Sequence, residues 1–319
     1  MEKDIKKIYF NKLHESSIAV HEFIEKEINK ISKSIPADLF FTFKSLPEKR
    51  FSKNTLRPFL TKIIFNVLSN DSSNDNLPVY VLSEINNYFA YLDNWILDNK
   101  NKIWNENKQR KTISHLTIAS ALFREISENI IHESNIDVFL KEKILGIFNK
   151  ATISSYIGQA IDMEMSIKTI SGYSSDEEYL QNYIKKSYLQ SGCLYGASLE
   201  AGAILANVDD ETRNRIKELG EVIGTGLHIS NDLGDFAILG ESSDFKNYQD
   251  QMADIRNGRL SLPIYWVLKY GNEYEKNIFK SAVTKKELTE DERILIVNVL
   301  HSSGAYTYCK KVIRSYYTI

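Results

Sequence analysis

The chain contains few of the residues that cross-link or interrupt a fold. Its 319 residues include two cysteines, five prolines and fourteen glycines. Two cysteines, Cys193 and Cys309, cannot form the disulfide framework of a secreted protein, so we predict a reducing, cytoplasmic location. Neither lies in a Cys–His spacing typical of a zinc site. Because prolines and glycines mark turns, their scarcity is typical of long helices joined by short loops.

Long apolar runs and an excess of charge of one sign are missing as well. No stretch approaches the roughly 18 apolar residues of a transmembrane helix, and the first residues lack the apolar run of a signal peptide. The net charge is −2, with 26% of residues charged, whereas nucleic-acid-binding proteins tend to be strongly basic. We therefore predict a soluble protein without a transmembrane anchor that does not bind nucleic acid.

The apolar residues that are present recur at the spacing of a helix. Between Leu116 and Ile131 they fall three or four residues apart, and the same period recurs in 179–206 and 216–227. Sustained strand-like alternation is not found. Hydrophobic residues make up 43% of the chain, which is enough for a sizeable core. The pattern predicts an all-α fold in which residues 1–319 form a single domain.

The segment from His228 to Asp235 gathers oxygen-bearing side chains among apolar residues. A helix would place Asn231, Asp232 and Asp235 on one face, because they lie three and four residues apart. Buried carboxylates are costly unless they are paired or bind a cation. Mg²⁺ prefers oxygen ligands and often bridges carboxylates to phosphates. The segment therefore predicts a magnesium–diphosphate site, although His228 could equally be an ordinary packed histidine.

Two further segments fit such a site. The stretch from Asp93 to Asp98 follows an apolar-periodic helix and carries Asn94 and Asp98 four residues apart. Basic residues, among them Arg256 and Arg259, follow the His228–Asp235 segment in the chain, where they could neutralise a departing pyrophosphate. Scattered surface acids and a solvated basic loop are the simpler alternatives for these segments.

Taken in order, these motifs resemble those of the trans-isoprenyl diphosphate synthase family. The resemblance covers most of the chain and rests on Leu56–Pro58, Asp93–Asp98, Gly158–Asp162, Ser191–Leu205, Leu227–Asp235 and Asp254–Pro263. It implies a helical bundle in which two Asp-rich motifs stand at an apolar cavity. It also implies a homodimer, an allylic prenyl diphosphate as substrate and pyrophosphate as a product.

The resemblance also assigns roles to individual residues. About three Mg²⁺ ions are expected with substrate bound, in an open oxygen site. The expected metal ligands are Asp93, Asn94, Asp98, Asn231, Asp232 and Asp235, of which the four aspartates are the catalytic candidates. The expected diphosphate-binding residues are Arg57, Arg110, Lys186, Lys246 and Arg259. The residues expected at the cavity or the substrate are Tyr88, Phe89, Gln159, Asp162 and His228.

Tyr88 and Phe89 also bear on the length of the substrate. They precede Asp93 by about one helical turn, which places them below the expected metal site. In the family that the chain resembles, bulky side chains at these positions close the floor of the cavity, so the resemblance implies short prenyl chains of about C10–C20. Two ordinary core aromatics are the alternative interpretation.

Several positions depart from the family pattern. In chain-elongating members, basic residues hold isopentenyl diphosphate, but the aligned positions are Asn54, Thr55 and Asn86. Only Arg57 remains of this set, and Lys49, Arg50 and Lys53 could compensate. Gln190 stands where a lysine is usual. Amides bind a diphosphate more weakly than cations do, so the isopentenyl diphosphate site is predicted to be eroded.

Three functions follow from this pattern. The first is a Mg²⁺-dependent enzyme that ionises an allylic diphosphate and lets the cation cyclise, as in a terpene synthase, or react with a non-standard acceptor. The second is a chain-elongating prenyl diphosphate synthase with displaced basic residues. The third is a non-catalytic subunit that regulates an active partner. The eroded acceptor site favours the first.

Overall fold

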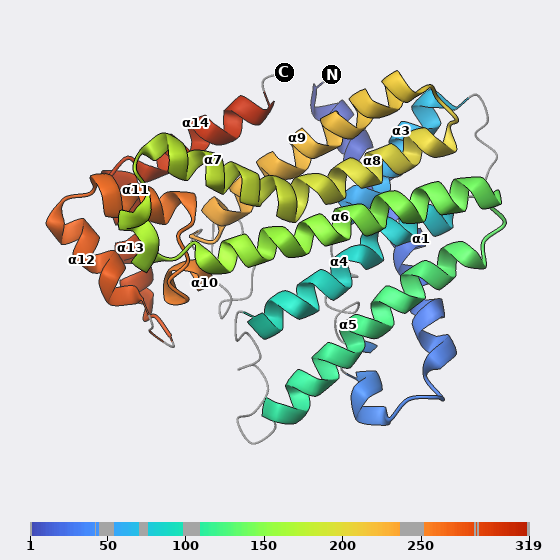
Figure 1. Ribbon diagram of the computed structural model, residues 1–319, viewed down its shortest axis with the longest axis horizontal. Helices are drawn as coiled ribbons and strands as arrows, with labels where there is room; N and C mark the ends of the chain where they lie inside the picture. The colour runs from blue at the N-terminus through green and yellow to red at the C-terminus, as the bar shows by residue number, and fades with distance from the viewer. Residues whose placement is uncertain are drawn as a thin grey trace. The chain divides into compact units, whose positions relative to one another are not determined.

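The computed structural model describes residues 2–41, 43–44, 54–69, 76–97, 109–236, 252–283, 285 and 287–317. Within these ranges the chain forms helices and one isolated β-bridge, between Ser166 and Arg259, and contains no strand (Figure 1). The prediction of an all-α protein is therefore confirmed. Among the same residues, no helix combines the length and apolar character needed to cross a membrane.

The helices group into two compact units. The first comprises Met1–Thr152 and Tyr195–Gly220, and the second comprises Ile153–Leu194 and Glu221–Ile319. Three helices contribute residues to both units, namely α6 (Val138–Glu164), α8 (Cys193–Leu205) and α9 (Asp210–Gly234). The prediction of a single domain over residues 1–319 stays a prediction.

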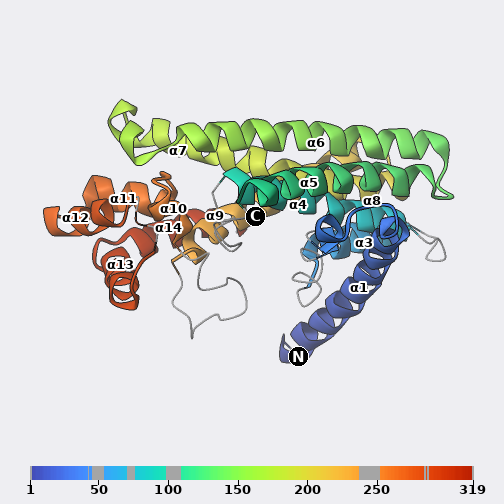
Figure 2. The same ribbon diagram turned by 90° about the horizontal axis from the view of Figure 1, so that it is seen from below.

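The first unit is built on a helix that is apolar on nearly all sides. It contains α1 (Glu2–Ile31), α3 (Leu56–Leu68), α4 (Leu77–Leu97) and α5 (Gln109–His132). α4 lies beside α5, and α1 and α3 pack against it (Figure 2). Tyr88 and Phe89 of α4 are almost fully buried, and Tyr88 meets Phe123 of α5 edge-on at 5.3 Å between ring centroids. Burying such side chains stabilises each by about 1.5–3 kcal/mol, which explains why α4 forms the centre of this unit.

The second unit holds the C-terminal helices. Its helices are orange and red after residue 252 in Figure 1, and green at residues 176–187. They are α7 (Asp176–Ser187), a π-turn η4 (Tyr188–Gly192), α10 (Ala253–Arg256), α11 (Leu262–Tyr270), α12 (Glu273–Ala282), α13 (Glu290–Ser302) and α14 (Ala305–Tyr317), with a 3₁₀ turn η3 (Ile167–Gly172) before α7. The local sequence sets where α12 and α13 begin. Asn272 forms a capping box with Glu275 at the start of α12, and Thr289 forms one with Glu292 at the start of α13.

An aromatic cluster ties α7 to α11. The Tyr179 ring stacks on the Tyr265 ring at 3.6 Å between centroids. Tyr265 donates a hydrogen bond of 2.5 Å to Asp176, and Tyr270 donates to the other oxygen of the same carboxylate. Burial raises the pKa of Tyr265, and its hydrogen bond to Asp176 raises it further, so the hydroxyl stays a donor. The beginning of α7 is thereby fixed to α11.

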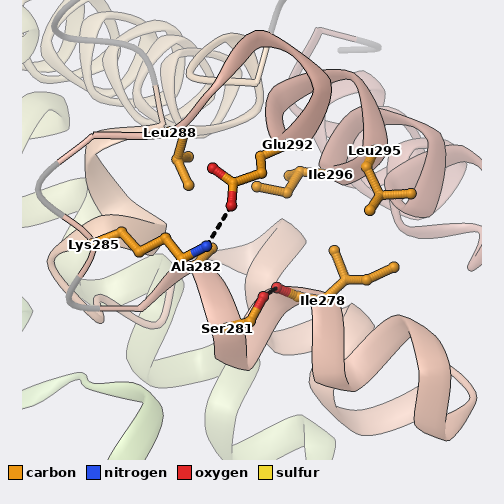
Figure 3. Close-up of a pocket in the computed structure, with 8 residues that line it drawn as sticks. All are labelled: Ile278, Ser281, Ala282, Lys285, Leu288, Glu292, Leu295 and Ile296. Carbon is orange, nitrogen blue, oxygen red and sulfur yellow. Dashed lines mark hydrogen bonds and ion pairs between the residues drawn. The ribbon is translucent and has the colours of Figure 1, made fainter.

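Two pockets lie in the described part of the second unit. One, of about 130 Å³, is enclosed by Ile278, Leu288 and Ile296, with Lys285 paired to Glu292 at its edge (Figure 3). The other, of about 660 Å³, lies along α6 and α7 and is lined by residues such as Ile161 and Tyr173. None of the predicted site residues lines either pocket. The predicted cavity near Tyr88 and Phe89, and the chain length inferred from it, stay predictions.

Candidate active site

The cluster predicted between His228 and Asp235 lies at the C-terminal end of α9. Asp232 is in the last turn of the helix with its side chain 12% exposed, and Asp235, just past the helix end, is 3% exposed. Asn231 is exposed to solvent instead. The helix therefore turns the two aspartates inward but does not bury all three predicted ligands, because Asn231 lies at the outer edge of the turn.

Lys186 lies at the centre of this cluster. Its Nζ atom is 3.0 Å from Oδ1 of Asp162 and 3.4 Å from Oδ2 of Asp232, and its side chain is 4% exposed. Tyr183, one turn earlier on α7, donates a hydrogen bond of 2.8 Å to the same Asp232 oxygen. Residues of α6, α7 and α9 thus converge on one ammonium group within the second unit.

The electrostatics keep this centre charged. Burial opposes the charge of the Lys186 ammonium, but the carboxylates of Asp162, Asp232 and Asp254 outweigh it and raise the pKa of Lys186. Burial, reinforced by the negative charge of Asp232, raises the pKa of Tyr183 well above its ordinary value. Lys186 therefore remains a cation, and Tyr183 remains a hydrogen-bond donor.

Asp235 joins the end of α9 to the start of α10. Its Oδ2 accepts a hydrogen bond of 3.2 Å from the backbone amide of Asp254, and its carbonyl accepts one of 3.0 Å from Met252. The turn continues through the Asp254 carbonyl, which accepts from the Arg259 amide at 2.9 Å. Gly258 has a φ of +67° in this turn, a conformation that glycine adopts at little cost.

Arg259 is held beside Asp162 by this turn. Its guanidinium donates a hydrogen bond of 3.1 Å to the Asp162 carbonyl, and its Nε is 3.8 Å from the Asp162 carboxylate. On either side, the Ile167 amide donates to Gly258 and the Leu260 amide donates to Met165, at 2.9 and 3.0 Å. The structure therefore brings together two of the predicted diphosphate-binding residues, Lys186 and Arg259, on one carboxylate.

Negative charge exceeds positive charge in this cluster. Asp162, Asp232, Asp235 and Asp254 gather around Lys186 and Arg259. Burial raises the pKa of Asp254 well above its ordinary value, and the charges of Asp235, Asp232 and Asp162 raise it further, against the opposing effect of Lys186. A surplus of carboxylates that are buried or partly buried is the donor set that suits a hard cation.

The donors present fit Mg²⁺ when it is shared with a substrate. In the described part of the chain, no group of three acidic, histidine or cysteine side chains is arranged to hold a metal ion unaided. Mg²⁺ is usually bound through one or two carboxylates together with substrate phosphates and waters, so it does not need such a group. Asp232, partly exposed beside Lys186, is the donor best placed for this.

Three polar side chains border the cluster. His228 Nε2 is 3.8 Å from Oδ1 of Asp232 and is buried without a hydrogen-bond partner. Burial lowers the pKa of His228, although the charge of Asp232 acts in the opposite direction. Gln190, in the π-turn, donates a hydrogen bond of 2.7 Å to Oε1 of Gln159 on α6. Three cavity candidates, Gln159, Asp162 and His228, thus lie at or beside this cluster.

Sequence reasoning did not select Tyr183 or Asp254 as site residues. Tyr183 lies three residues before Lys186, so helical periodicity could have placed it on the same face. Asp254 belongs to a segment that was recognised for its arginines, and its backbone contact with Asp235 has no sequence signal.

The other predicted residues lie in the first unit or outside the described residues. Asp93 and Asn94 are half-buried in the last turns of α4, as predicted for the end of a helix. Arg57 is buried in α3, with its guanidinium 5.2 Å from the centroid of the Tyr195 ring. Asp98 and Lys246 are outside the described residues, and of Arg110 only the backbone, in α5, is described.

The positions that depart from the family pattern carry uncharged side chains. The Thr55 amide donates to Ser17 at 2.9 Å, and the Asn54 side chain lies 3.4 Å from the His14 ring. Asn86 is buried in α4, and its Nδ2 has no hydrogen-bond partner. Lys49, Arg50 and Lys53 lie outside the described residues. No cation is therefore supplied by the aligned positions themselves.

Residues 105–299 match the family model of the polyprenyl synthetases. The chain belongs to the polyprenyl synthetase family. This confirms the family resemblance drawn from the motifs, and with it the prediction of a prenyl-diphosphate-dependent enzyme.

Relatives and solved structures agree with this assignment. A short chain isoprenyl diphosphate synthase of Methanocaldococcus jannaschii is 24% identical over 258 residues, which cover 79% of this chain and 73% of that protein. A geranylgeranyl diphosphate synthase of Sulfolobus acidocaldarius is 26% identical over 176 residues, 55% of this chain and about half (49%) of the relative. These relatives carry the names of prenyl diphosphate synthases.

The fold is that of solved family members. A polyprenyl synthase of Caulobacter crescentus, complexed with calcium and isoprenyl diphosphate, superposes with a TM-score of 0.74 at 18% identity, over 96% of this chain and 88% of that one. A geranylgeranyl pyrophosphate synthetase of Pyrococcus horikoshii gives 0.69 at 19% identity, over 95% and 89%. The predicted isoprenoid-synthase type of helical fold is confirmed.

Proposed function

We propose that the protein is a chain-elongating prenyltransferase that joins an allylic prenyl diphosphate to isopentenyl diphosphate and releases pyrophosphate. The observation that carries the proposal is the convergence of Lys186, Arg259, Asp162 and Asp232 in a member of the polyprenyl synthetase family. The names of the relatives favour chain elongation over the cyclising enzyme that the sequence alone favoured.

The buried cations are proposed to act on the leaving group. Lys186 and Arg259 are held on Asp162, where their charge would stabilise the negative charge that develops on pyrophosphate as the allylic bond breaks. Bound Mg²⁺ would neutralise the same oxygens. Asp232 and Asp235 are proposed as ligands from the second Asp motif, with Asn231 at its exposed edge, and Asp93, Asn94 and Asp98 as ligands from the first.

A second candidate function rests on the acceptor positions. Isopentenyl diphosphate needs charge-assisted partners, yet Asn54, Thr55 and Asn86 are neutral, and Arg57 is buried against Tyr195. This observation favours an enzyme whose allylic cation cyclises or reacts with a different acceptor.

One incubation series separates these functions. Purified protein with Mg²⁺ is given geranyl, farnesyl or geranylgeranyl diphosphate, each with and without isopentenyl diphosphate, and pyrophosphate and organic products are measured. Chain elongation predicts longer diphosphates only when isopentenyl diphosphate is present. Hydrocarbon or alcohol from the allylic substrate alone would favour the second candidate. No pyrophosphate from any substrate would favour a non-catalytic regulatory subunit.

The site assignment has a matched pair of variants. Asp232→Ala removes the carboxylate shared by Lys186 and Tyr183 and is expected to abolish pyrophosphate release while the helical circular dichroism is retained. Asp291→Ala changes an exposed acid in the first turn of α13 and should leave activity unchanged. Full activity of Asp232→Ala would refute the assignment.

The assembly and the location are also proposals. We propose a homodimer in the cytoplasm, supported for the dimer by large exposed apolar side chains such as Phe139, which is 75% exposed on α6. Light scattering coupled to size-exclusion chromatography tests the dimer, and a monomer at micromolar concentration would contradict it.

A further inference from the structure

The ammonium group of Lys186 is held in place by three side chains of the second unit. Its Nζ atom is 3.0 Å from Asp162 and 3.4 Å from Asp232. It also lies 4.9 Å from the centroid of the Tyr183 ring, within the range of a cation–π contact. Tyr183 donates to the same Asp232 oxygen that faces Lys186. The ammonium group is therefore fixed between two carboxylates and does not extend into solvent.

The two carboxylates already have the partners that their burial requires. A carboxylate that is taken out of water needs an opposite charge and hydrogen bonds. Asp232, which is partly buried, has both through Lys186 and Tyr183. Asp162, also partly buried, faces the cations of Lys186 and Arg259. Neither carboxylate therefore needs a metal ion to be stable in the folded protein.

A divalent cation at Asp232 would meet the charge of Lys186. The metal ion and the ammonium group would share one carboxylate, and like charges that are close and shielded from water repel strongly. A diphosphate relieves this repulsion, because its oxygens accept hydrogen bonds from an ammonium group and coordinate the metal ion as well. Metal and diphosphate should therefore strengthen each other's binding, and by linkage they do so by the same factor.

We propose that Lys186 is a built-in counter-ion that keeps divalent metal off Asp162 and Asp232 until a diphosphate binds. In the free protein, its ammonium group supplies the positive charge that these carboxylates require. In the complex, the ammonium group is shared with phosphate oxygens, and the carboxylate of Asp232 becomes available to the metal. The inference rests on the proposed function for its ligand, a diphosphate with its metal ion. It adds that Lys186 determines when the metal binds.

Equilibrium dialysis with Mn²⁺, which prefers the same oxygen ligands as Mg²⁺, tests this order of binding. It measures the metal held by the protein, since the small complex of Mn²⁺ with pyrophosphate distributes equally across the membrane. The wild type should bind Mn²⁺ at least about tenfold more tightly with pyrophosphate than without it. Lys186→Gln removes the charge and should bind Mn²⁺ alone at least about tenfold more tightly than the wild type does. Lys186→Arg keeps the charge and should bind Mn²⁺ alone as weakly as the wild type.

Lys185→Gln is the matched control, because Lys185 is the preceding residue of α7 and is exposed, so this variant should bind Mn²⁺ as the wild type does. Wild-type protein that binds Mn²⁺ equally well with and without pyrophosphate would overturn the proposal, and this result needs no variant to fold. A Lys186→Gln protein with wild-type circular dichroism that binds Mn²⁺ no better than Lys185→Gln would overturn it too. Wild-type protein that binds no Mn²⁺ even with pyrophosphate would count against the proposed function instead, and Lys186→Gln alone would then decide the inference.

Discussion

The backbone amide of Asp254 donates a 3.2 Å hydrogen bond to the carboxylate of Asp235. Because the Asp235 carbonyl also accepts from Met252, a single residue connects the end of α9 to the beginning of α10. Asp235 therefore orders the backbone from which Arg259 reaches Asp162. Its position in an Asp-rich motif suggests a metal ligand, and its contacts give it a positioning role as well.

Replacing Asp235 should separate these two roles. Asp235→Ala leaves the Asp254 amide without its acceptor, and we expect a loss of about 1–3 kcal/mol in the free energy of unfolding. Asp235→Asn keeps an acceptor oxygen and should remain close to the wild type in stability. Urea denaturation without metal measures both. If Asn is as destabilising as Ala, the hydrogen bond is not what makes Asp235 important.

Lys186 should be the most costly single cation to remove. Lys186→Met removes the ammonium group shared by Asp162 and Asp232, and breaking a buried pair costs about 3–5 kcal/mol. Adding Asp162→Asn to this variant should recover part of the stability. Lys269→Met is the control, because Lys269 lies 3.9 Å from Asp176 with both side chains nearly half exposed, and such pairs contribute about 0–1 kcal/mol. Similar losses in the two single variants would contradict the central role of Lys186.

Gly258 should tolerate alanine poorly. Its φ of +67° costs an L-residue about 1–2 kcal/mol, and a shift of the turn would move Arg259. We expect Gly258→Ala to lower the melting temperature and raise the KM for the allylic diphosphate. Gly146→Ala, in α6 where nothing lies within 4 Å of the added Cβ, should instead stabilise by up to about 1 kcal/mol. A Gly258→Ala enzyme with unchanged KM would show that the turn does not position Arg259.

Asp254 should make stability fall as pH rises. Its pKa is raised in the folded protein by burial and by Asp235, Asp232 and Asp162. A group of this kind contributes stability that is present below the unfolded pKa, about 4 for Asp, and lost as pH rises through the folded pKa. In metal-free buffer, Asp254→Asn should therefore gain stability relative to the wild type from about pH 4 upward. A difference that stays constant with pH would contradict this, and added Mg²⁺ should reduce it.

The sequence predicted the helices and the location of the charged cluster well, because both depend on local spacing. Asp232 and Lys186 were named from motifs, and the structure places them 3.4 Å apart. Spacing could not reveal that Asn231 faces solvent while Asp235 is buried, since the helix ends between them. The pairing of Gln190 with Gln159 depends on the π-turn, which no residue pattern marks.

The aromatic tether between α7 and α11 has a consequence for the order in which the site can form. Asp162, Lys186 and Asp232 are synthesised before Tyr265 and Tyr270, which hold the start of α7 through Asp176. Tyr179 and Tyr183 are buried in a core that also contains residues of α11 and, from α14, Cys309. Their burial therefore requires both helices. A ribosome-bound chain that ends before these helices would carry the charged residues of the site without the core that positions them. We therefore expect the site to become ordered only after α14 has been synthesised.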